Sequence, residues 1–431
     1  MSYDEHSQSS GTKRKTNSVK QFWLISALGF VIAFNPATAQ ELSWHGFLQT
    51  NYSLRTTGLT PNSNQSDFLW ADQRLQLKLS TSEGEARAFT KVDLFQDALE
   101  SKADLEIREA FLDYRLGDFD FRAGRQIITW GLGDLLFVND LFPKDWEAFF
   151  SGRPIEYLKI GVDAIKSTFS SSVFSLELAI LPFFQPDNIP TSEKFFLYDP
   201  LASISNRTEE KPASKFENFE QTLRLYHTFS SFEVTIYAYR GFYRSPSVKP
   251  DSLPTQIIYH YPKLSVYGSS LQKNLYNGIF SLEYGFYDSR EDRAGDNPII
   301  PNSFHKFMAG YQRQGWKDFN YSFQFYGEYM SDYSNYEKSL AIGFPKQDRF
   351  RQLLTVRATQ FLKYQTLKFS WFTFFSPSDN DYYLLPEVQY KISDKLWMAL
   401  GGNIFGGERK TTFLGQFDKN DNTYLTLRYE F

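Results

Sequence analysis

The sequence predicts a single all-β domain, an antiparallel up-and-down transmembrane β-barrel of about eighteen strands, from three observations. Runs of roughly ten residues alternate apolar and polar side chains, the pattern of a strand with lipid on one face and water on the other. The connections between these runs are alternately tight and long. Aromatic residues make up 18% of the 431 residues, yet the mean hydropathy is −0.44, too polar for a bundle of membrane helices.

The first 39 residues have the features of a secretory signal peptide. Four basic residues precede an apolar run at 22–34, which is too short to cross a membrane as a helix. The sequence Ala-Thr-Ala at 37–39 then supplies the small residues of a cleavage site. We therefore expect an exported chain whose mature part, the barrel domain 40–431, begins near Gln40.

The alternation begins directly after the signal peptide. From Leu42 to Leu54 the even positions are mostly apolar and the odd positions mostly polar. Further strands are expected near 69–79, 86–94, 110–116, 119–123, 156–166, 172–181, 218–228, 231–241, 257–268, 274–287, 304–313, 318–330, 350–361, 365–375, 382–391, 395–405 and 422–431. The run 257–268 contains Pro262, which cannot donate a ladder hydrogen bond. Sixteen strands is therefore the alternative, if 257–268 and 274–287 are misread.

The connections predict which ends of the strands face which side of the membrane. Every second connection is tight, for example 80–85 and 269–274. The others are mostly long, at 56–66, 126–156, 182–217, 242–256, 288–303, 331–349 and 406–421. Short periplasmic turns that alternate with long external loops are typical of bacterial outer-membrane barrels. An even number of strands places both ends of the barrel on the periplasmic side.

The segment 126–156 departs from the alternation while remaining rich in large apolar residues. Exposed to solvent, these side chains would be left uncovered, so we expect the segment to fold into the barrel lumen and narrow it. Trp130 and Trp146 are candidate anchors of this inserted loop. It also carries four acidic residues, Asp134, Asp140, Asp145 and Glu147.

The lumen-facing positions of the second to fifth strands are rich in basic residues, namely Arg74, Lys78, Arg87, Lys91, Arg115 and Arg122. A basic wall that faces an acidic inserted loop would create a transverse field, which orients polar solutes and penalises apolar ones. The alternative is that these charges are solvated or paired locally, as Arg115 could be with Asp113 and Glu109. Both interpretations stay open.

Four phenylalanines share the lumen-facing positions near these cations: Phe47, Phe89, Phe95 and Phe111. They could stack on sugar rings. The interpretation that we favour is that they cover the apolar side of the inserted loop.

Catalysis, cofactors and metals are not expected. The chain has no cysteine and five histidines, and it contains neither a G-x-S-x-G nor an H-E-x-x-H motif. Its formal net charge of −4 does not indicate a nucleic-acid partner.

Two sequence features resemble bacterial outer-membrane proteins. The last eight residues alternate and end in Phe431, which resembles the C-terminal signature that the barrel-assembly machinery reads. The blocks 108–115 (REAFLDYR), 123–126 (AGRQ), 130–131 (WG) and 139–145 (NDLFPKD) resemble porin-like families, in which such a strand leads into an inserted loop. A more distant resemblance is to the eighteen-stranded alginate-export porins. Those have a heavily arginine-lined lumen, whereas the lumen here is mixed in sign.

The resemblance implies a channel, and it implies that Arg125 and Asp145 anchor the loop. We therefore expect a porin of a Gram-negative outer membrane that lets small hydrophilic solutes diffuse passively. The alternatives are a polymer-export channel, or a plugged barrel used in surface binding or assembly, with its lumen filled by 182–217 and 331–349. The expected partners are membrane lipid, lipopolysaccharide, the assembly machinery and the solute; association into a homotrimer is left open.

Overall fold

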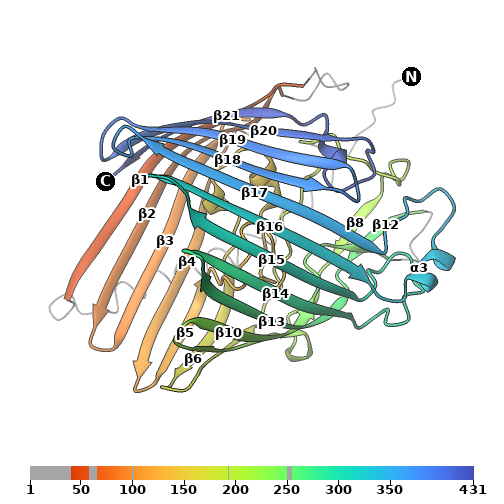
Figure 1. Cartoon of the computed structure of the whole chain (residues 1–431), viewed down its shortest axis with the longest axis horizontal. Coiled ribbons are helices and arrows are strands. Elements are labelled where there is room, and N and C mark those ends of the chain that lie inside the picture. Colours follow the sequence, from red (N-terminus) through yellow and green to blue (C-terminus); the bar gives the residue numbers. More distant parts are fainter. Residues whose placement is uncertain (1–39, 58–65, 100, 193, 250–254) are drawn as a thin grey trace, which may run out of the picture.

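The computed structural model describes residues 40–57, 66–99, 101–192, 194–249 and 255–431. Eighteen antiparallel strands form one closed sheet, and β21 pairs with β1 to complete the barrel (Figure 1). The wall strands are β1 (Gln40–Arg55), β2 (Phe68–Glu83), β3 (Ala86–Asp97), β4 (Lys102–Leu116), β5 (Phe119–Gln126), β6 (Val162–Ser170), β7 (Ser175–Leu181), β9 (Glu220–Thr228), β10 (Phe232–Phe242), β13 (Lys263–Leu275), β14 (Gly278–Ser289), β15 (Phe304–Gln314), β16 (Phe319–Met330), β17 (Phe350–Leu362), β18 (Leu367–Ser376), β19 (Asp381–Lys391), β20 (Leu396–Gly407) and β21 (Asn422–Glu430). The predicted fold class and the count of eighteen strands are confirmed.

The long connections gather at one end of the barrel and the tight turns at the other (Figure 1). At the loop end, β8 (Arg207–Glu210), β11 (Ser247–Val248) and β12 (Ile257–His260) form a small separate sheet. Short helical turns also lie in the connections: α2 (Trp146–Phe150), α3 (Tyr333–Ser339), η1 (Ile155–Tyr157), η2 (Phe216–Asn218) and η4 (Gly415–Phe417). Within the described residues, no helix is both long and apolar enough to cross a membrane.

The period-2 pattern separates the two faces of the wall as the sequence predicts. On β1, Leu48 points outward and is 53% exposed, while its neighbour Gln49 points inward and is 3% exposed. The same alternation gives the outer face a belt of leucines and aromatic rings. This belt is the surface that a lipid bilayer covers.

Several predicted boundaries differ from the structure, and three of them have a local cause. The run 257–268 is split at Pro262: its first part is β12 of the small sheet, and the wall strand β13 begins at Lys263. The turn predicted at 269–274 lies instead at Tyr276 and Asn277, whose φ values of 49° and 59° suit a tight hairpin that matches the strand twist.

The third boundary is the start of β6, which lies at Val162 and not near 156. Residues 155–157 form η1 directly after Pro154, and Tyr157 is fully buried, so this stretch belongs to the connection. The expected signal peptide (1–39) and residues 58–65 of the first long loop lie outside the described residues.

Candidate functional site

Residues 127–161, here called the crossing segment, join β5 to β6 and bond to strands on the far side of the barrel. The Glu283 carboxylate on β14 accepts the backbone N–H groups of Leu132 and Gly133, the latter at 2.7 Å. It also accepts the side-chain amide of Asn139 at 2.8 Å. Glu283 is only 3% exposed, so these donors and their acceptor are withdrawn from bulk water.

The next residue along, Asp134, bonds to two further strands. Its N–H donates to Gln324 on β16 at 2.7 Å, and its carbonyl oxygen accepts from the same side chain at 2.8 Å. Its carboxylate pairs with Arg357 on β17 at 2.8 Å. β17 lies nine strands from β5 in either direction around the sheet, so the segment reaches the opposite wall.

The apolar side chains of the crossing segment pack against that wall. Leu136, Val138, Phe149 and Phe150 belong to one buried cluster. Their wall partners come from β16 and β18–β20, with additions from the loops, and include Tyr326, Phe372, Phe374, Tyr383, Phe405, Leu414 and Phe417. Burial of these side chains is the main source of stability for the docked segment.

The ring contacts of the four inward phenylalanines are with one another and with arginines of the wall, and none of the four belongs to the buried cluster that contains the loop. Phe89 stacks on Phe111 with ring centroids 5.1 Å apart. Phe47 lies under the guanidinium of Arg428 at 3.9 Å, and Phe95 under that of Arg74 at 4.5 Å. The loop instead finds its apolar cover on the opposite wall, because α2 projects its two phenylalanines toward β19 and β20.

After α2 the crossing segment returns along the first strands. Its backbone carbonyls at Phe150 and Gly152 accept from Asn422 on β21 (3.1 Å) and Asn51 on β1 (3.3 Å). The ring of Tyr157 is then surrounded by three guanidinium groups, those of Arg74, Arg108 and Arg153, at 4.7, 4.8 and 4.3 Å. The segment thus contacts wall strands around most of the barrel.

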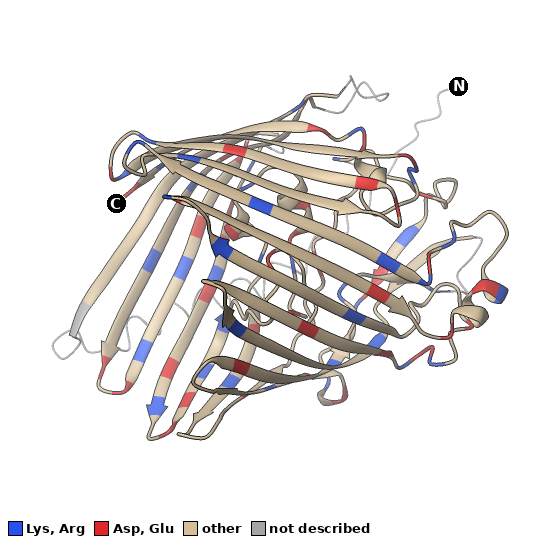
Figure 2. Cartoon of the chain, viewed as in Figure 1, with Lys and Arg blue, Asp and Glu red and all other residues tan. Residues whose placement is uncertain are grey.

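Four of the six predicted basic-wall residues are paired with acids of the wall: Arg74 with Asp72 and Asp93, Lys91 with Glu109, Arg122 with Asp113, and Arg115 with Asp120. Lys78 and Arg87 have no ion-pair partner among the residues that the structure describes. Figure 2 shows basic and acidic residues interspersed along these strands. This arrangement matches the local-pairing alternative for four of the six cations.

The four acids of the loop each have a partner other than those six cations. Asp134 pairs with Arg357, Asp140 with Lys144 and Lys159, and Glu147 with Lys194, while Asp145 caps α2 through the N–H of Ala148 and accepts from Asn188. The structure therefore does not bring the predicted wall and the predicted acids into contact as one filter.

The predicted anchors Arg125 and Trp130 lie at the start of the segment, and Trp146 lies near its centre. Arg125 donates to the carbonyl of Ile107 at 2.8 Å, and Trp130 donates its indole N–H to Glu177 at 2.6 Å. Trp146 donates to Asp187 at 3.0 Å. All three contacts join the segment or its flank to another part of the chain.

The loop 182–219 lies on the crossing segment. Asp187 accepts the N–H of Lys144 at 2.8 Å, and Asn188 donates its N–H to the Lys144 carbonyl at 2.8 Å. Burial raises the pKa of the Asp187 carboxyl and lowers the pKa of the Lys144 ammonium. By contrast, the loop 331–349 carries α3 away from the barrel (Figure 1), and its Ile342 is fully exposed.

Several residues that hold the segment were not singled out from the sequence: Glu283, Gln324, Arg357 and Asp187. Glu283 offered one signal, since an acid stands at a lumen-facing position between Leu282 and Tyr284. The other three are unremarkable in sequence. Within the described residues, no group of three or more histidines and acids is placed to hold a metal ion.

The solved structures with a similar fold include proteins of Pseudomonas aeruginosa and Acinetobacter baumannii. OccK3 (OpdO) of Pseudomonas aeruginosa matches with a TM-score of 0.54 at 10% identity, over 91% of this chain and 96% of that chain. OccD3 (OpdP) of the same organism matches with 0.53 at 11%, over 91% and 92%. OccAB3 of Acinetobacter baumannii matches with 0.52 at 12%, over 91% and 99%. No protein-family model and no curated protein sequence matches the chain.

The similarity to these structures, at 10–12% identity, supports only the fold. The membrane location is supported by the structure of the wall itself. A closed sheet leaves no unpaired strand edge in lipid, and its outer face is apolar. The resemblance to porin-like barrels is confirmed at the level of the fold: the chain is an eighteen-stranded β-barrel of a bacterial outer membrane.

Proposed function

We propose that the protein is a channel through which small hydrophilic solutes diffuse passively, past a constriction formed by the crossing segment. One observation carries the proposal: the segment leaves β5 and is hydrogen-bonded to Glu283, Gln324 and Arg357 on the far wall. A segment fixed at both sides of a barrel divides its lumen and sets the narrowest width. No cofactor or energy coupling is part of this proposal.

Within this channel, we assign the ion preference to the two basic-wall residues without ion pairs. Lys78 faces the lumen beside Lys91, its direct cross-strand neighbour, and Arg87 is exposed four residue pairs nearer the turns. Unpaired charges in a narrow, low-dielectric passage act on ions more strongly than neutralised pairs do. Arg74 is unsuited to this role because it is buried between two carboxylates.

A plugged barrel is the second candidate, and a specific contact favours it. The loop 182–219 hydrogen-bonds to Lys144 and Trp146 and places Phe195 in the buried cluster of the crossing segment. Two layers of chain therefore lie in the loop end of the lumen. Such a barrel would serve surface binding or assembly, and it would conduct only if these layers move.

The deciding measurement is single-channel recording on the folded mature chain in a planar lipid bilayer, under a salt gradient. Discrete current steps support the channel, and Lys78→Glu and Arg87→Glu should each move the reversal potential toward cation preference. Lys410→Glu, on an exposed loop, is the matched control and should leave the potential unchanged. Current steps whose reversal potential is the same in all variants would support the channel and contradict the assignment of its ion preference to Lys78 and Arg87. If the folded protein gives no current steps, the channel is contradicted and the plugged barrel is supported.

Two steps of biogenesis belong to the same proposal: removal of residues 1–39 near Gln40, and recognition of the C-terminal strand by the assembly machinery. The terminal Phe431 is bonded back to Gly46 in both directions, at 3.0 and 3.2 Å, so it also closes the seam between the first and last strands.

A further inference from the structure

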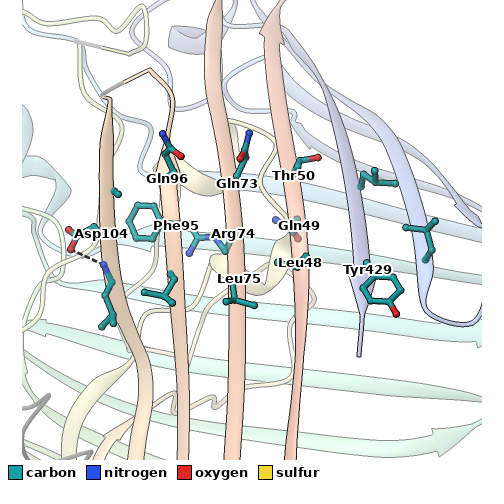
Figure 3. Close-up of a pocket in the computed structure, with 15 residues that line it drawn as sticks. Leu48, Gln49, Thr50, Gln73, Arg74, Leu75, Phe95, Gln96, Asp104 and Tyr429 are labelled. Atoms are coloured by element: carbon teal, nitrogen blue, oxygen red, sulfur yellow. Dashed lines mark hydrogen bonds between the residues drawn. The ribbon is translucent and has the colours of Figure 1, made fainter.

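The outer wall is hollowed at the seam where the last strands meet the first (Figure 3). The hollow has a volume of about 900 Å³ and is formed by side chains of β1–β4, β20 and β21. Its apolar lining includes six leucines, together with Ala103, Tyr429 and Phe95: Leu48, Leu75, Leu94, Leu105, Leu396 and Leu427. On a surface that faces lipid, such a lining suits an acyl chain.

A row of polar side chains crosses the same hollow. Thr50 is the cross-strand partner of Gln73, and Gln73 is the partner of Gln96, so the three stand side by side on β1, β2 and β3. In Figure 3 they lie at one level, one step along the strands from Leu48 and Leu75. Both glutamines are exposed on the outer face.

This row lies inside the apolar belt and not at its margin. Leucines lie on its turn side, while Tyr52, Leu54 and Phe68 are exposed on its loop side. Water is scarce at that depth, and an amide without a hydrogen-bond partner in hydrocarbon is unfavourable. A membrane component that can bond to the amides is therefore expected to cover them.

The amides also specify what that component must offer. Each glutamine has an N–H₂ group that requires an acceptor and an oxygen that requires a donor. The ester linkages of a phospholipid supply acceptors only. An acyl chain attached through an amide and carrying a hydroxyl group supplies donors and acceptors at the point where the chain begins.

We propose that the hollow binds one outer-leaflet glycolipid whose hydroxylated acyl chains are attached through amides. Its amide and hydroxyl groups bond to Gln73 and Gln96, and one chain lies along the leucines toward the midplane. The polar row stands nearer the loop end of the strands than the leucines do, which is the orientation of a lipid in the outer leaflet. The site is independent of whether the lumen conducts.

The test is native mass spectrometry of the whole folded barrel released from nanodiscs of two compositions. One composition contains lipopolysaccharide with phospholipid, and the other phospholipid alone. The wild type should retain one lipopolysaccharide molecule and no phospholipid. The double variant Gln73→Leu/Gln96→Leu should retain roughly tenfold less, which corresponds to about 1.4 kcal/mol.

Two further variants separate the site from general effects. Leu94→Trp fills the hollow but keeps both amides, and it should lower retention as well. Gln221→Leu makes the same exchange at an exposed outer position on β9 and should change nothing. Barrel integrity is checked by heat-modifiable gel mobility.

Three results would overturn the proposal. One is equal retention of phospholipid and lipopolysaccharide by the wild type. Another is undiminished retention by the double glutamine variant. The third is a dimer mass that disappears in that variant, which would make this face a contact between two copies of the chain.

Discussion

The hydrogen bonds of Glu283 should set how firmly the crossing segment is docked. Glu283→Met keeps the length of the side chain and removes every acceptor, so the N–H groups of Leu132 and Gly133 and the amide of Asn139 lose their partner. A buried donor without a partner costs about 1–3 kcal/mol. Taking the low end for each of the three donors, docking should weaken by about 3 kcal/mol, or on the order of a hundredfold in the undocked population.

Glu283→Gln provides an intermediate point, because the remaining carbonyl still accepts. With the loss of about one bond, the undocked population should rise about fivefold. Arg357→Met leaves the bonds of Glu283 in place and removes the pair with Asp134, whose two side chains are about one-third exposed. A pair with that exposure contributes at most about 1 kcal/mol, so its effect should not exceed about fivefold.

Hydrogen exchange with mass spectrometry on folded protein measures this directly, because the exchange rate of the peptide 131–141 follows the population of the undocked state. Glu233→Gln is the matched control: this half-buried glutamate lies at the turn end of β10, 3.8 Å from Arg224 on β9. Exchange in Glu283→Met that stays within about twofold of the wild type would refute the assigned role of these bonds.

Two other predictions concern the seam and the loops. In Gly46→Ala the added Cβ would lie 2.7 Å from the Phe431 ring and against the carbonyl of Gln76. The free energy of unfolding of the barrel should therefore fall by about 1–3 kcal/mol, and heat-modifiable gel mobility should show unfolding at a lower temperature. An unchanged unfolding temperature would contradict this closure of the seam. Burial raises the pKa of Asp187 and Asp145 in the docked loops above their values in undocked ones, so docking is most favourable below the ordinary carboxylate pKa of about 4 and weakens as the pH rises through the raised values. The protection factors of 182–190 (the intrinsic exchange rate at each pH divided by the observed rate) should therefore be higher at pH 5 than at pH 7.5, and Asp187→Asn should reduce the difference.

The local pairing of the wall charges changes what the lumen can do. A row of free arginines would bind anions strongly, whereas Arg74 and Arg122 are held by carboxylates on the same or the next strand. Opposite charges placed across strands stabilise the sheet as well as lowering the net field. Under the proposed function, the unpaired Lys78 and Arg87 are the basic-wall residues that act on solutes.

The sequence by itself determined the wall. Alternation with a period of two is a property of each strand alone, so the outer position of Leu48 and the inner position of Gln49 could be read without knowing any partner. The order of the strands followed as well, because short turns join neighbours in an up-and-down sheet. The alternation did not show where one strand ends and the next begins within the apolar run around Pro262, where β12 ends at His260 and β13 begins at Lys263.

Only the tertiary structure decided what the wall encloses. The acids of the crossing segment could be named from the sequence, but their partners lie up to nine strands away, and Arg357 carries no local mark that distinguishes it from other lumen arginines. Side-chain pairing across a lumen depends on barrel closure, register and the path of a non-repeating segment. These are long-range properties, and a local periodicity contains no information about them.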